Sequence, residues 1–396
     1  MGKELEVPEA EIAKLEIAKP EIAGSGIAEL EKRRRILLMA PHLGGGGAEQ
    51  VMARVAAGVD RARFEVHVAV VTDDEPGAAQ LPEWVTVHRL EAGRVRRAAP
   101  GVVRLIGRTQ PEVVVPMMLH LSALVLALRP LLPRGTRLVP RVNTTVSRAL
   151  TGGVERRVYG WLMQRADGVI CQTEAMAEDV QAVLGVARAK TWVAANPVDV
   201  EGIRAAARRW AREGTSEPVQ VLSVGRLAKE KGMDLLLEAW ARVASVDEHA
   251  RLTIVGEGAE RDRLEALRRR LGLEATVKMV GFEPEVARWL GWADVYVQPS
   301  RYEGMPNALL EAAAAGLALV TTPSSEGVVR LLDGCDGAWI AREPSSEALA
   351  EALSEAVQQA RGGVGRLEHL FLEPFAQATA LRAWEQCLER AAGACR

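Results

Sequence analysis

Two glutamates, Glu303 and Glu311, stand eight positions apart in the segment QPSRYEGMPNALLEAAAAG. Glu303 falls in a loop after the apolar run 295–298, whereas Glu311 falls in a strongly helix-forming stretch. Proline suits the start of a helix, so we expect a helix from Pro306 that ends at Gly316. Its N-terminus offers N–H groups and a positive dipole end to an anion, and carboxylates accept hydrogen bonds from sugar hydroxyls. The strand, the glycine and the proline around the two glutamates indicate a ligand site. The spacing of the glutamates alone would fit one capping glutamate and one surface glutamate.

Two cations, Arg226 and Lys231, follow another apolar run in LSVGRLAKEKGMDLLLEAW. With Gly225, they lie between an expected strand end and an expected helix start. Arginine supplies a planar fork of donors and lysine a compact charge, so the pair suits the oxygens of a diphosphate. Basic residues are common in such loops. Their combination with the glutamate segment is what favours a diphosphate clamp, in which the two cations bind the diphosphate oxygens.

Four consecutive glycines, residues 44–47, follow the apolar run 36–40 and precede Ala48 and Glu49. Bare backbone lets a phosphate or an acceptor molecule approach closely. A dinucleotide-binding dehydrogenase is an alternative. However, the spacing is not G-x-G-x-x-G, and the next strand, 64–71, ends without the expected acidic residue.

Short apolar runs alternate with helical stretches from residue 35 onward, seven before residue 198 and six after residue 218. This alternation predicts an α/β protein with parallel sheets covered on both faces. We expect two tandem doubly wound, Rossmann-like domains, with a ligand cleft at the carboxyl ends of their strands. Residues 1–31 form a degenerate Glu-Ile-Ala-Lys repeat interrupted by Pro20 and Gly24, which indicates a variable, flexible extension, with a partner-binding helix as the alternative.

The charge of the 396-residue chain is nearly balanced, with 50 basic and 52 acidic residues, which argues against a nucleic-acid binder. Residues 31–200, however, carry a formal charge of +7 and residues 201–396 one of −5. The basic part suits an anionic membrane surface or acceptor, and an ordinary arginine-rich surface is the alternative. The four cysteines show no C-x-x-C spacing, and no apolar run reaches about 18 residues. We therefore expect a cytoplasmic protein, with peripheral attachment to the inner face of the membrane as an option.

Taken together, these motifs resemble the large family of retaining glycosyltransferases of the GT-B fold, family four. The resemblance covers about residues 35–392 and rests on EGMPNALLE, GRLAKEKGMDLLLEA, LTIVGEGAERDRLE, VKMVGF and NPVD. It implies transfer of a hexose-type sugar from a nucleotide-sugar donor to a glycan, glycolipid or other acceptor, in cell-surface polysaccharide biosynthesis. It also implies an acceptor-binding domain over 32–198, completed by a C-terminal helix in 374–396, and a donor-binding domain over 199–373.

The resemblance also assigns roles to single residues. Glu303 would contact the transferred sugar, Arg226 and Lys231 would neutralise the diphosphate, and Glu311 would hold the ribose. His120 would line the site near the sugar, with an ordinary helix-start histidine as the alternative. The other expected donor-binding residues are Gly225, Gly256, Gly304, Met305, Pro306 and Asn307. The expected acceptor or phosphate loop comprises Gly45, Gly46, Gly47, Glu49, Arg141 and Asn143.

No metal or other cofactor is expected. A D-x-D motif is missing, and Asp333 and Asp336 have the wrong spacing for one; the cations and the helix N-terminus would stabilise the leaving diphosphate instead. A sugar phosphorylase or nucleotide-sugar epimerase on the same scaffold, and a non-catalytic sugar-nucleotide binder, remain alternatives. The sequence leaves open the nucleotide, the sugar, the acceptor and the oligomeric state.

Overall fold

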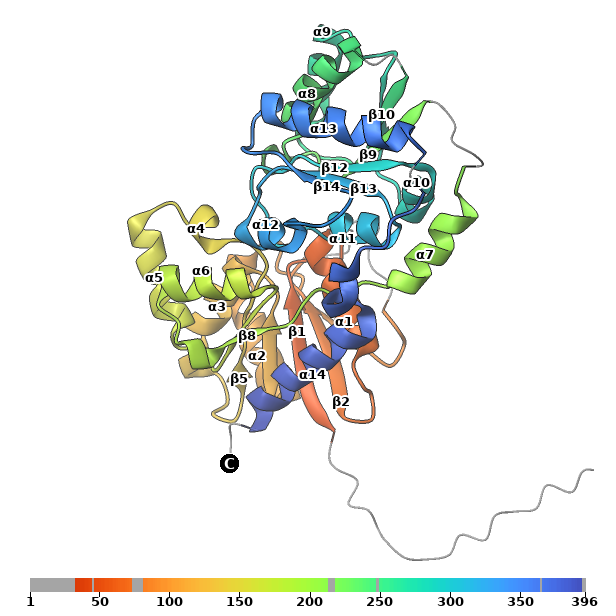
Figure 1. Ribbon diagram of the computed structural model, residues 1–396. Helices are drawn as coiled ribbons and strands as arrows, with labels where there is room; N and C mark the ends of the chain where they lie inside the picture. The colour runs from red at the N-terminus through yellow and green to blue at the C-terminus, as the bar shows by residue number, and fades with distance from the viewer. Residues whose placement is uncertain are drawn as a thin grey trace, which may run out of the picture. The chain divides into compact units, whose positions relative to one another are not determined.

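The computed structural model describes residues 33–44, 46–72, 81–212, 218–246, 249–363 and 365–393. The expected N-terminal extension and Gly45 lie outside these residues. Strands and helices alternate along the described chain (Figure 1), and every pair of neighbouring strands is parallel. The prediction of a doubly wound α/β architecture is therefore confirmed.

The first lobe holds a five-stranded sheet in the order β3-β2-β1-β4-β5 and a three-stranded sheet in the order β6-β7-β8. The strands are β1 (Arg34–Ala40), β2 (Phe64–Val70), β3 (Thr86–Arg89), β4 (Val113–Pro116), β5 (Arg137–Leu138), β6 (Arg141–Val142), β7 (Val169–Cys171) and β8 (Thr191–Val193). The helices are α1 (Gly47–Gly58), α2 (Ala99–Thr109), α3 (Leu119–Ala127), α4 (Val146–Ala149), α5 (Gly153–Met163) and α6 (Glu174–Leu184), with 3₁₀ turns η1 (Val95–Arg97), η2 (Arg129–Leu131) and η3 (Arg188–Lys190).

One of the seven apolar runs before residue 198, residues 137–141, does not form the single strand expected of it, because the chain changes sheet within it. Residues 137–138 pair with β4, whereas Arg141 and Val142 pair with β7. Pro140 has no N–H with which to continue the first ladder, and its carbonyl accepts a 2.9 Å bond from the N–H of Ile170. Pairing with the first sheet therefore ends before Pro140, and pairing with the second sheet begins there.

The second lobe holds one six-stranded sheet in the order β11-β10-β9-β12-β13-β14. Its strands are β9 (Val219–Val224), β10 (Ala250–Val255), β11 (Val277–Gly281), β12 (Val295–Gln298), β13 (Ala318–Thr321) and β14 (Ala338–Ile340). Its helices are α7 (Val200–Arg209), α8 (Met233–Val246), α9 (Arg261–Arg270), α10 (Val286–Trp292), α11 (Asn307–Ala314), α12 (Glu326–Leu332) and α13 (Ser346–Arg361), with η4 at Lys229–Lys231. The strand order reverses between β9 and β12, and parallel sheets bind ligands at such a switch point.

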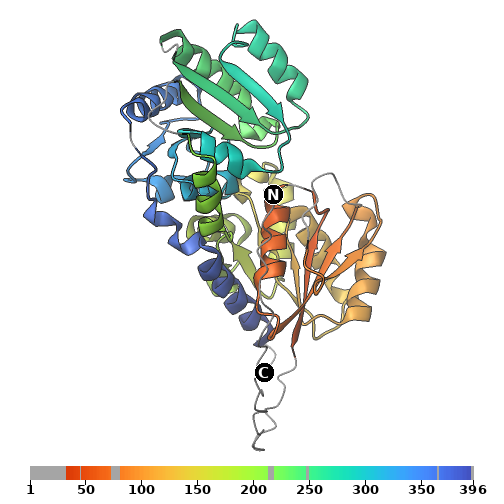
Figure 2. The ribbon, with the colours of Figure 1, turned by 90° about the vertical axis from the view of Figure 1, so that its right-hand side faces the viewer.

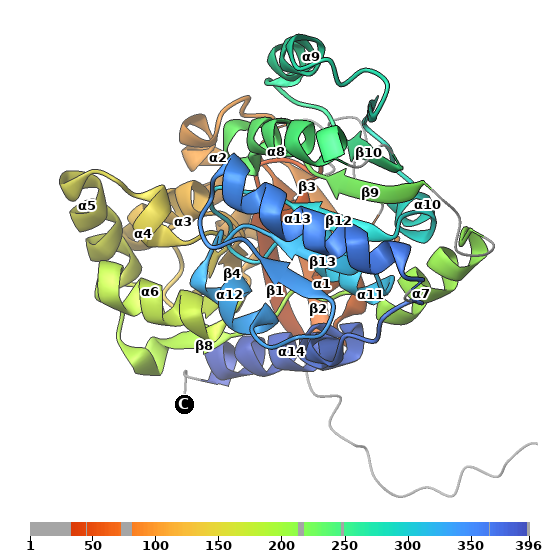
Figure 3. The same cartoon turned by 45° about the horizontal axis from the view of Figure 1, so that its top comes forward.

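Helices cover both faces of each sheet, which explains the continuous apolar strands. In β1, Leu37 and Met39 join one core cluster, whereas Ile36, Leu38 and Ala40 join another. In the second lobe, α8 and α13 pack on one face of the sheet (Figure 3), and α11 and α12 contribute to the core on the other. No helix in the described parts of the chain is long and apolar enough to cross a membrane.

The last helix, α14 (Gln377–Gly393), packs against the first lobe after the 3₁₀ turn η5 (Leu370–Phe375) (Figure 2). Trp384 and Cys387 belong to the same core cluster as Ile36, Leu38 and Ala40 of β1 and buried apolar residues of α1. The indole N–H of Trp384 donates a 3.0 Å hydrogen bond to the carbonyl of Ala195. The expected C-terminal helix is thus present, but it begins at Gln377 and not at Pro374.

This packing predicts protected thiols. Burial raises the pKa of both Cys171 and Cys387 to about 12, which leaves only about one thiolate in 10,000 at pH 8. In a Cys335→Ser/Cys395→Ser variant, we expect almost no reaction of the native protein with Ellman's reagent at pH 8. Both remaining thiols should react after denaturation in guanidinium. Rapid labelling of the native variant, located by mass spectrometry at Cys387, would contradict the packing of α14.

Candidate active site

Two loops meet at the switch point of the second lobe, one after β9 and one after β12. Gly232 closes the first loop with a φ of +65°, and a β-carbon there would lie 2.0 Å from the carbonyl oxygen of Pro299 in the second loop. Only glycine tolerates both this conformation and this approach. Gly232 therefore brings the preceding residue, Lys231, next to the β12 loop.

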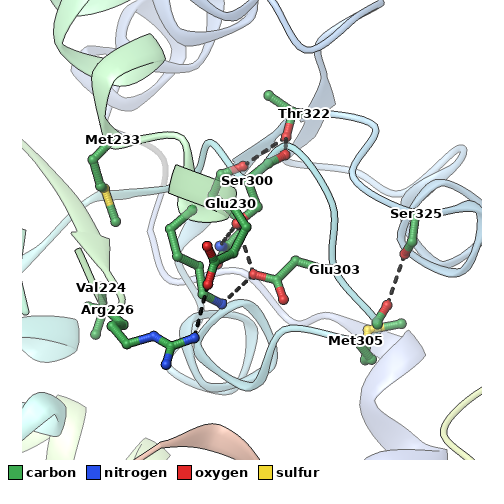
Figure 4. Close-up of polar contacts among 12 residues, drawn as sticks. Val224, Arg226, Glu230, Met233, Ser300, Glu303, Met305, Thr322 and Ser325 are labelled. Carbon is green, nitrogen blue, oxygen red and sulfur yellow. Dashed lines mark hydrogen bonds and ion pairs between the residues drawn. The ribbon is translucent and has the colours of Figure 1, made fainter. Parts of the chain in front are cut away.

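Lys231 and Glu303 form an ion pair across these loops, and Figure 4 shows where Glu303 and Ser300 lie. The Lys231 Nζ lies 2.5 Å from Glu303 Oε1, and both side chains are largely shielded from solvent. The hydroxyl of Ser300 donates a 2.9 Å bond to the same carboxylate oxygen. Two residues that the resemblance assigns to the leaving diphosphate and to the sugar are thus in direct contact.

A buried chain of hydrogen bonds supports this pair from β12. Gln298 Nε2 donates to Ser300 Oγ at 2.6 Å, and Tyr296 donates from its hydroxyl to Gln298 Oε1 at 2.6 Å. Burial, followed by the negative charges of Glu303 and Glu311, raises the pKa of Tyr296 well above its usual value. The phenol therefore remains a donor, and the chain fixes the position of Ser300.

Arg226, the other expected clamp residue, does not contact Glu303. Its side chain is 71% exposed and pairs with Glu230 at 2.9 Å, as Figure 4 shows. Its neighbour Gly225 carries a carbonyl that would lie 1.9 Å from a β-carbon on Gly256. The two expected donor-site glycines therefore touch, whereas the Arg226 guanidinium lies exposed to solvent beside Glu230.

The loop after Glu303 is held from both lobes through its main chain. The hydroxyl of Thr145 donates to the Glu303 carbonyl at 2.7 Å, and Gln172 Oε1 accepts from the Met305 N–H at 2.8 Å. From the second lobe, the hydroxyl of Ser325 donates to the Gly304 carbonyl at 2.9 Å. A β-carbon at Gly304 would lie 2.6 Å from the Asn143 carbonyl oxygen. The first lobe thus directly contacts the loop that carries Glu303.

A second set of contacts connects the start of α11 with the first lobe. Asn196 donates from Nδ2 to Asn307 Oδ1 at 2.6 Å, and Asn307 donates from Nδ2 to the Gly47 carbonyl at 2.8 Å. The helix begins at Asn307, with Pro306 as its cap residue, so the expected start at Pro306 is one residue early. Gly47, from the expected phosphate loop, thus lies beside the expected donor helix.

Arg141 lies beneath this set of contacts and not on an open acceptor surface. It is fully buried and donates from Nη2 to Asn196 Oδ1 at 2.7 Å. Its Nε and Nη1 have no hydrogen-bond partner among the described residues. Burial lowers the pKa of Arg141 to about 10, against the opposing influence of Cys171 and Glu49. In this structure the guanidinium of Arg141 holds Asn196 and is shielded from solvent, and its expected role in the acceptor or phosphate loop stays a prediction.

The expected ribose ligand, Glu311, is held by a residue that the sequence did not single out. Arg54 Nη2 lies 2.7 Å from Glu311 Oε1, and Arg54 Nη1 donates to the Pro197 carbonyl at 3.0 Å. Arg54 belongs to α1, so this ion pair also joins the two lobes. A ribose must share the Glu311 carboxylate with Arg54 or displace it.

His120 lies apart from these contacts. It is exposed at the start of α3, desolvation lowers its pKa, and no hydrogen bond or ion pair reaches it within the described residues. Glu49, in contrast, is buried, with its carboxylate close to Gly46 and 3.6 Å from His42 Nε2. The described residues contain no group of three His, Cys, Asp or Glu side chains arranged to hold a metal ion, and the expectation of metal independence stays a prediction.

Comparison with known proteins connects this geometry to a family. The model of Glycosyltransferase Family 4 matches residues 45–201, and that of Glycosyl transferases group 1 matches residues 218–359. Between them, the two models match both lobes. The chain belongs to the glycosyltransferase family that these two models describe. Its fold is GT-B: HepE of Anabaena, solved in complex with UDP and glucose, aligns with a TM-score of 0.74 and 18% identity over 90% of this chain and 100% of that one.

Curated relatives include the amylovoran biosynthesis glycosyltransferase AmsK of Erwinia amylovora. It is 35% identical over 150 residues, or 36% of this chain and 37% of AmsK. The match therefore spans little more than a third of that relative's length. A longer match, 26% identical over 308 residues, covers 73% of this chain and 80% of the N-acetylgalactosamine-N,N'-diacetylbacillosaminyl-diphospho-undecaprenol 4-alpha-N-acetylgalactosaminyltransferase of Campylobacter jejuni.

The role of Gly232 can be tested against a matched glycine. Gly272 also has a positive φ, +68°, but a β-carbon there would meet nothing within 4 Å. Gly272→Ala should lower the free energy of unfolding by about 1 kcal/mol, the strain of a left-handed alanine. Gly232→Ala should lower it by about 1–3 kcal/mol more through overpacking, as measured by denaturant unfolding. Equal losses in the two variants would mean that Gly232 does not set the contact with Pro299.

Proposed function

We propose that the protein transfers a hexose-type sugar from a nucleotide-sugar donor to a glycan or lipid-linked acceptor, with retention of configuration and without a metal ion. The observation that carries this proposal is the Lys231–Glu303 pair at the switch point of the second lobe. A cation and a carboxylate there suit the two halves of a nucleotide sugar, its diphosphate and its hydroxyl-bearing ring.

Donor binding would exchange the partners within this pair. The diphosphate takes the charge of Lys231, and the freed Glu303 carboxylate accepts hydrogen bonds from the sugar and steadies its developing positive charge. Arg226 can leave Glu230 for the diphosphate, because its exposed side chain meets little steric hindrance. As the glycosidic bond breaks, these fixed charges stabilise the leaving group more than they stabilise the bound donor.

The acceptor would approach from the first lobe, whose residues Asn143 and Thr145 border the Glu303 loop. Its hydroxyl would attack from the face that the diphosphate leaves, which retains the configuration of the sugar, and its proton would pass to an oxygen of the departing diphosphate. Two comparisons support the substrate classes: HepE was solved with UDP, and the Campylobacter relative is named for a diphospho-undecaprenol acceptor. The name of AmsK supports a role in polysaccharide biosynthesis.

The proposal predicts a large loss of turnover when either residue of the Lys231–Glu303 pair is replaced. Glu303→Ala and Lys231→Ala should each lower turnover at least about 100-fold, the usual effect of losing a preorganised electrostatic contact. Turnover is measured as UDP release from a UDP-hexose in the presence of a lipid-diphosphate-linked sugar, and NMR of the product should show a retained anomeric configuration. Glu351→Ala and Lys278→Ala, exposed charges of the same lobe, serve as controls.

Wild-type rates in both site variants would refute the assignment. Turnover that requires inorganic phosphate would indicate a phosphorylase, and conversion of the donor without an acceptor would indicate an epimerase. Tight donor binding without any turnover would indicate a binding protein.

A further inference from the structure

Helix α5 of the first lobe carries an exposed apolar stripe. Val154, Val158 and Trp161 recur at helical spacing on one face and are 75%, 50% and 57% exposed. Leu131, 66% exposed, lies in η2, and Arg129 of η2 donates a 3.1 Å bond to the carbonyl of Arg165 just after α5. Single exposed apolar residues are ordinary, but a continuous stripe indicates an interaction surface.

Arginines outnumber acidic residues in the segment that carries this stripe. Residues 121–170 contain eight arginines but only two acidic residues, Glu155 and Asp167. Asp167 is already paired with Arg129 and Arg137. The Arg165 guanidinium stacks 3.4 Å from the centre of the Trp161 ring, and Arg157 is exposed on α5 itself. We call Leu131, Val154, Val158 and Trp161, with Arg157 and Arg165, the α5 surface.

The chemistry of the α5 surface selects its partner. A helix with tryptophan and aliphatic residues on one face and arginines beside them suits the interface of a bilayer, where apolar groups enter and cations meet phosphates. A second copy of the chain, packed through the same surface, would instead set arginines against arginines. An anionic membrane satisfies both the apolar and the charged groups.

We propose that the α5 surface docks the protein on an anionic lipid bilayer. Val154, Val158 and Trp161 would enter the headgroup region, and the flanking arginines would contact lipid phosphates. Helices α4 and α5 lie together on one flank of the first lobe (Figure 1), away from α14 on the same lobe.

Hydrogen bonds also connect the α5 surface with the candidate active site. Arg156 of α5 donates to the carbonyls of Leu150 and Ser147 at 2.6 Å and 3.0 Å, which ties α5 to α4. The residue that caps α4, Thr145, donates to the Glu303 carbonyl. If the proposed function holds, a lipid-linked acceptor would enter from the membrane beside the Glu303 loop. Membrane docking itself does not depend on that function.

Vesicle sedimentation tests the docking without substrate. The full chain should bind vesicles of phosphatidylcholine with about 30% phosphatidylglycerol much more tightly than vesicles of phosphatidylcholine alone, and binding should weaken as salt shortens the range of the attraction. Val154→Ser/Trp161→Ser should lower the partition coefficient at least about tenfold. Arg157→Gln/Arg165→Gln should lower it by about fivefold for each arginine.

Matched variants on the second lobe provide the controls. Val246 and Leu370 are 80% and 83% exposed, and Arg269 and Arg270 are exposed on α9. Val246→Ser/Leu370→Ser and Arg269→Gln/Arg270→Gln should bind vesicles like the unmodified chain. Equal binding by the α5 variants and their controls, or no binding to anionic vesicles, would overturn the proposal. A dimer that Val154→Ser/Trp161→Ser dissociates in sedimentation velocity would assign the surface to a second copy instead.

Discussion

The Glu303–Asn307 loop is held by hydrogen bonds from both lobes, and the other contacts of the candidate site depend on its position. Thr145, Gln172 and Asn196 reach it from the carboxyl ends of the first-lobe strands, and Ser325 reaches it from its own lobe. These bonds use the main chain of the loop, so they constrain its path and leave the Glu303 carboxylate for Lys231. Because the first lobe supplies three of these groups, the position of the loop depends on both lobes.

Charged side chains of the site are paired with one another. Lys231 pairs with Glu303, Arg54 with Glu311, and Arg226 with Glu230. Partly buried charges need partners, because an isolated one would carry a large desolvation penalty. A nucleotide sugar carries both anionic oxygens and hydroxyls, so it can offer an anion to Lys231 and hydrogen bonds to the carboxylates when it replaces the protein's own partners. The Arg54–Glu311 pair joins the two lobes, so exchange there would couple donor binding to the contact between lobes.

The sequence predicted the doubly wound fold because strands buried on both faces are continuously apolar and are separated by helices. It also predicted which loops carry Glu303 and Lys231, since each loop begins where such a strand ends. It could not predict Arg54, because that residue acts 257 positions away from Glu311. Gln172 and Asn196 gave a weak signal as polar residues after apolar runs, but their partners follow from the packing of lobes. The burial of Arg141 could not be predicted either, since an arginine at a strand start gives no indication that it will be fully buried.

The central claim is that the switch point of the second lobe binds a nucleoside diphosphate through the protein's own cations. Calorimetric titration of UDP, GDP and ADP into the full chain, in EDTA and again in magnesium, tests it most directly. The account predicts that one of the three binds equally well in EDTA and that its affinity falls sharply in Lys231→Ala. If none binds, or if binding requires magnesium, the claim is contradicted.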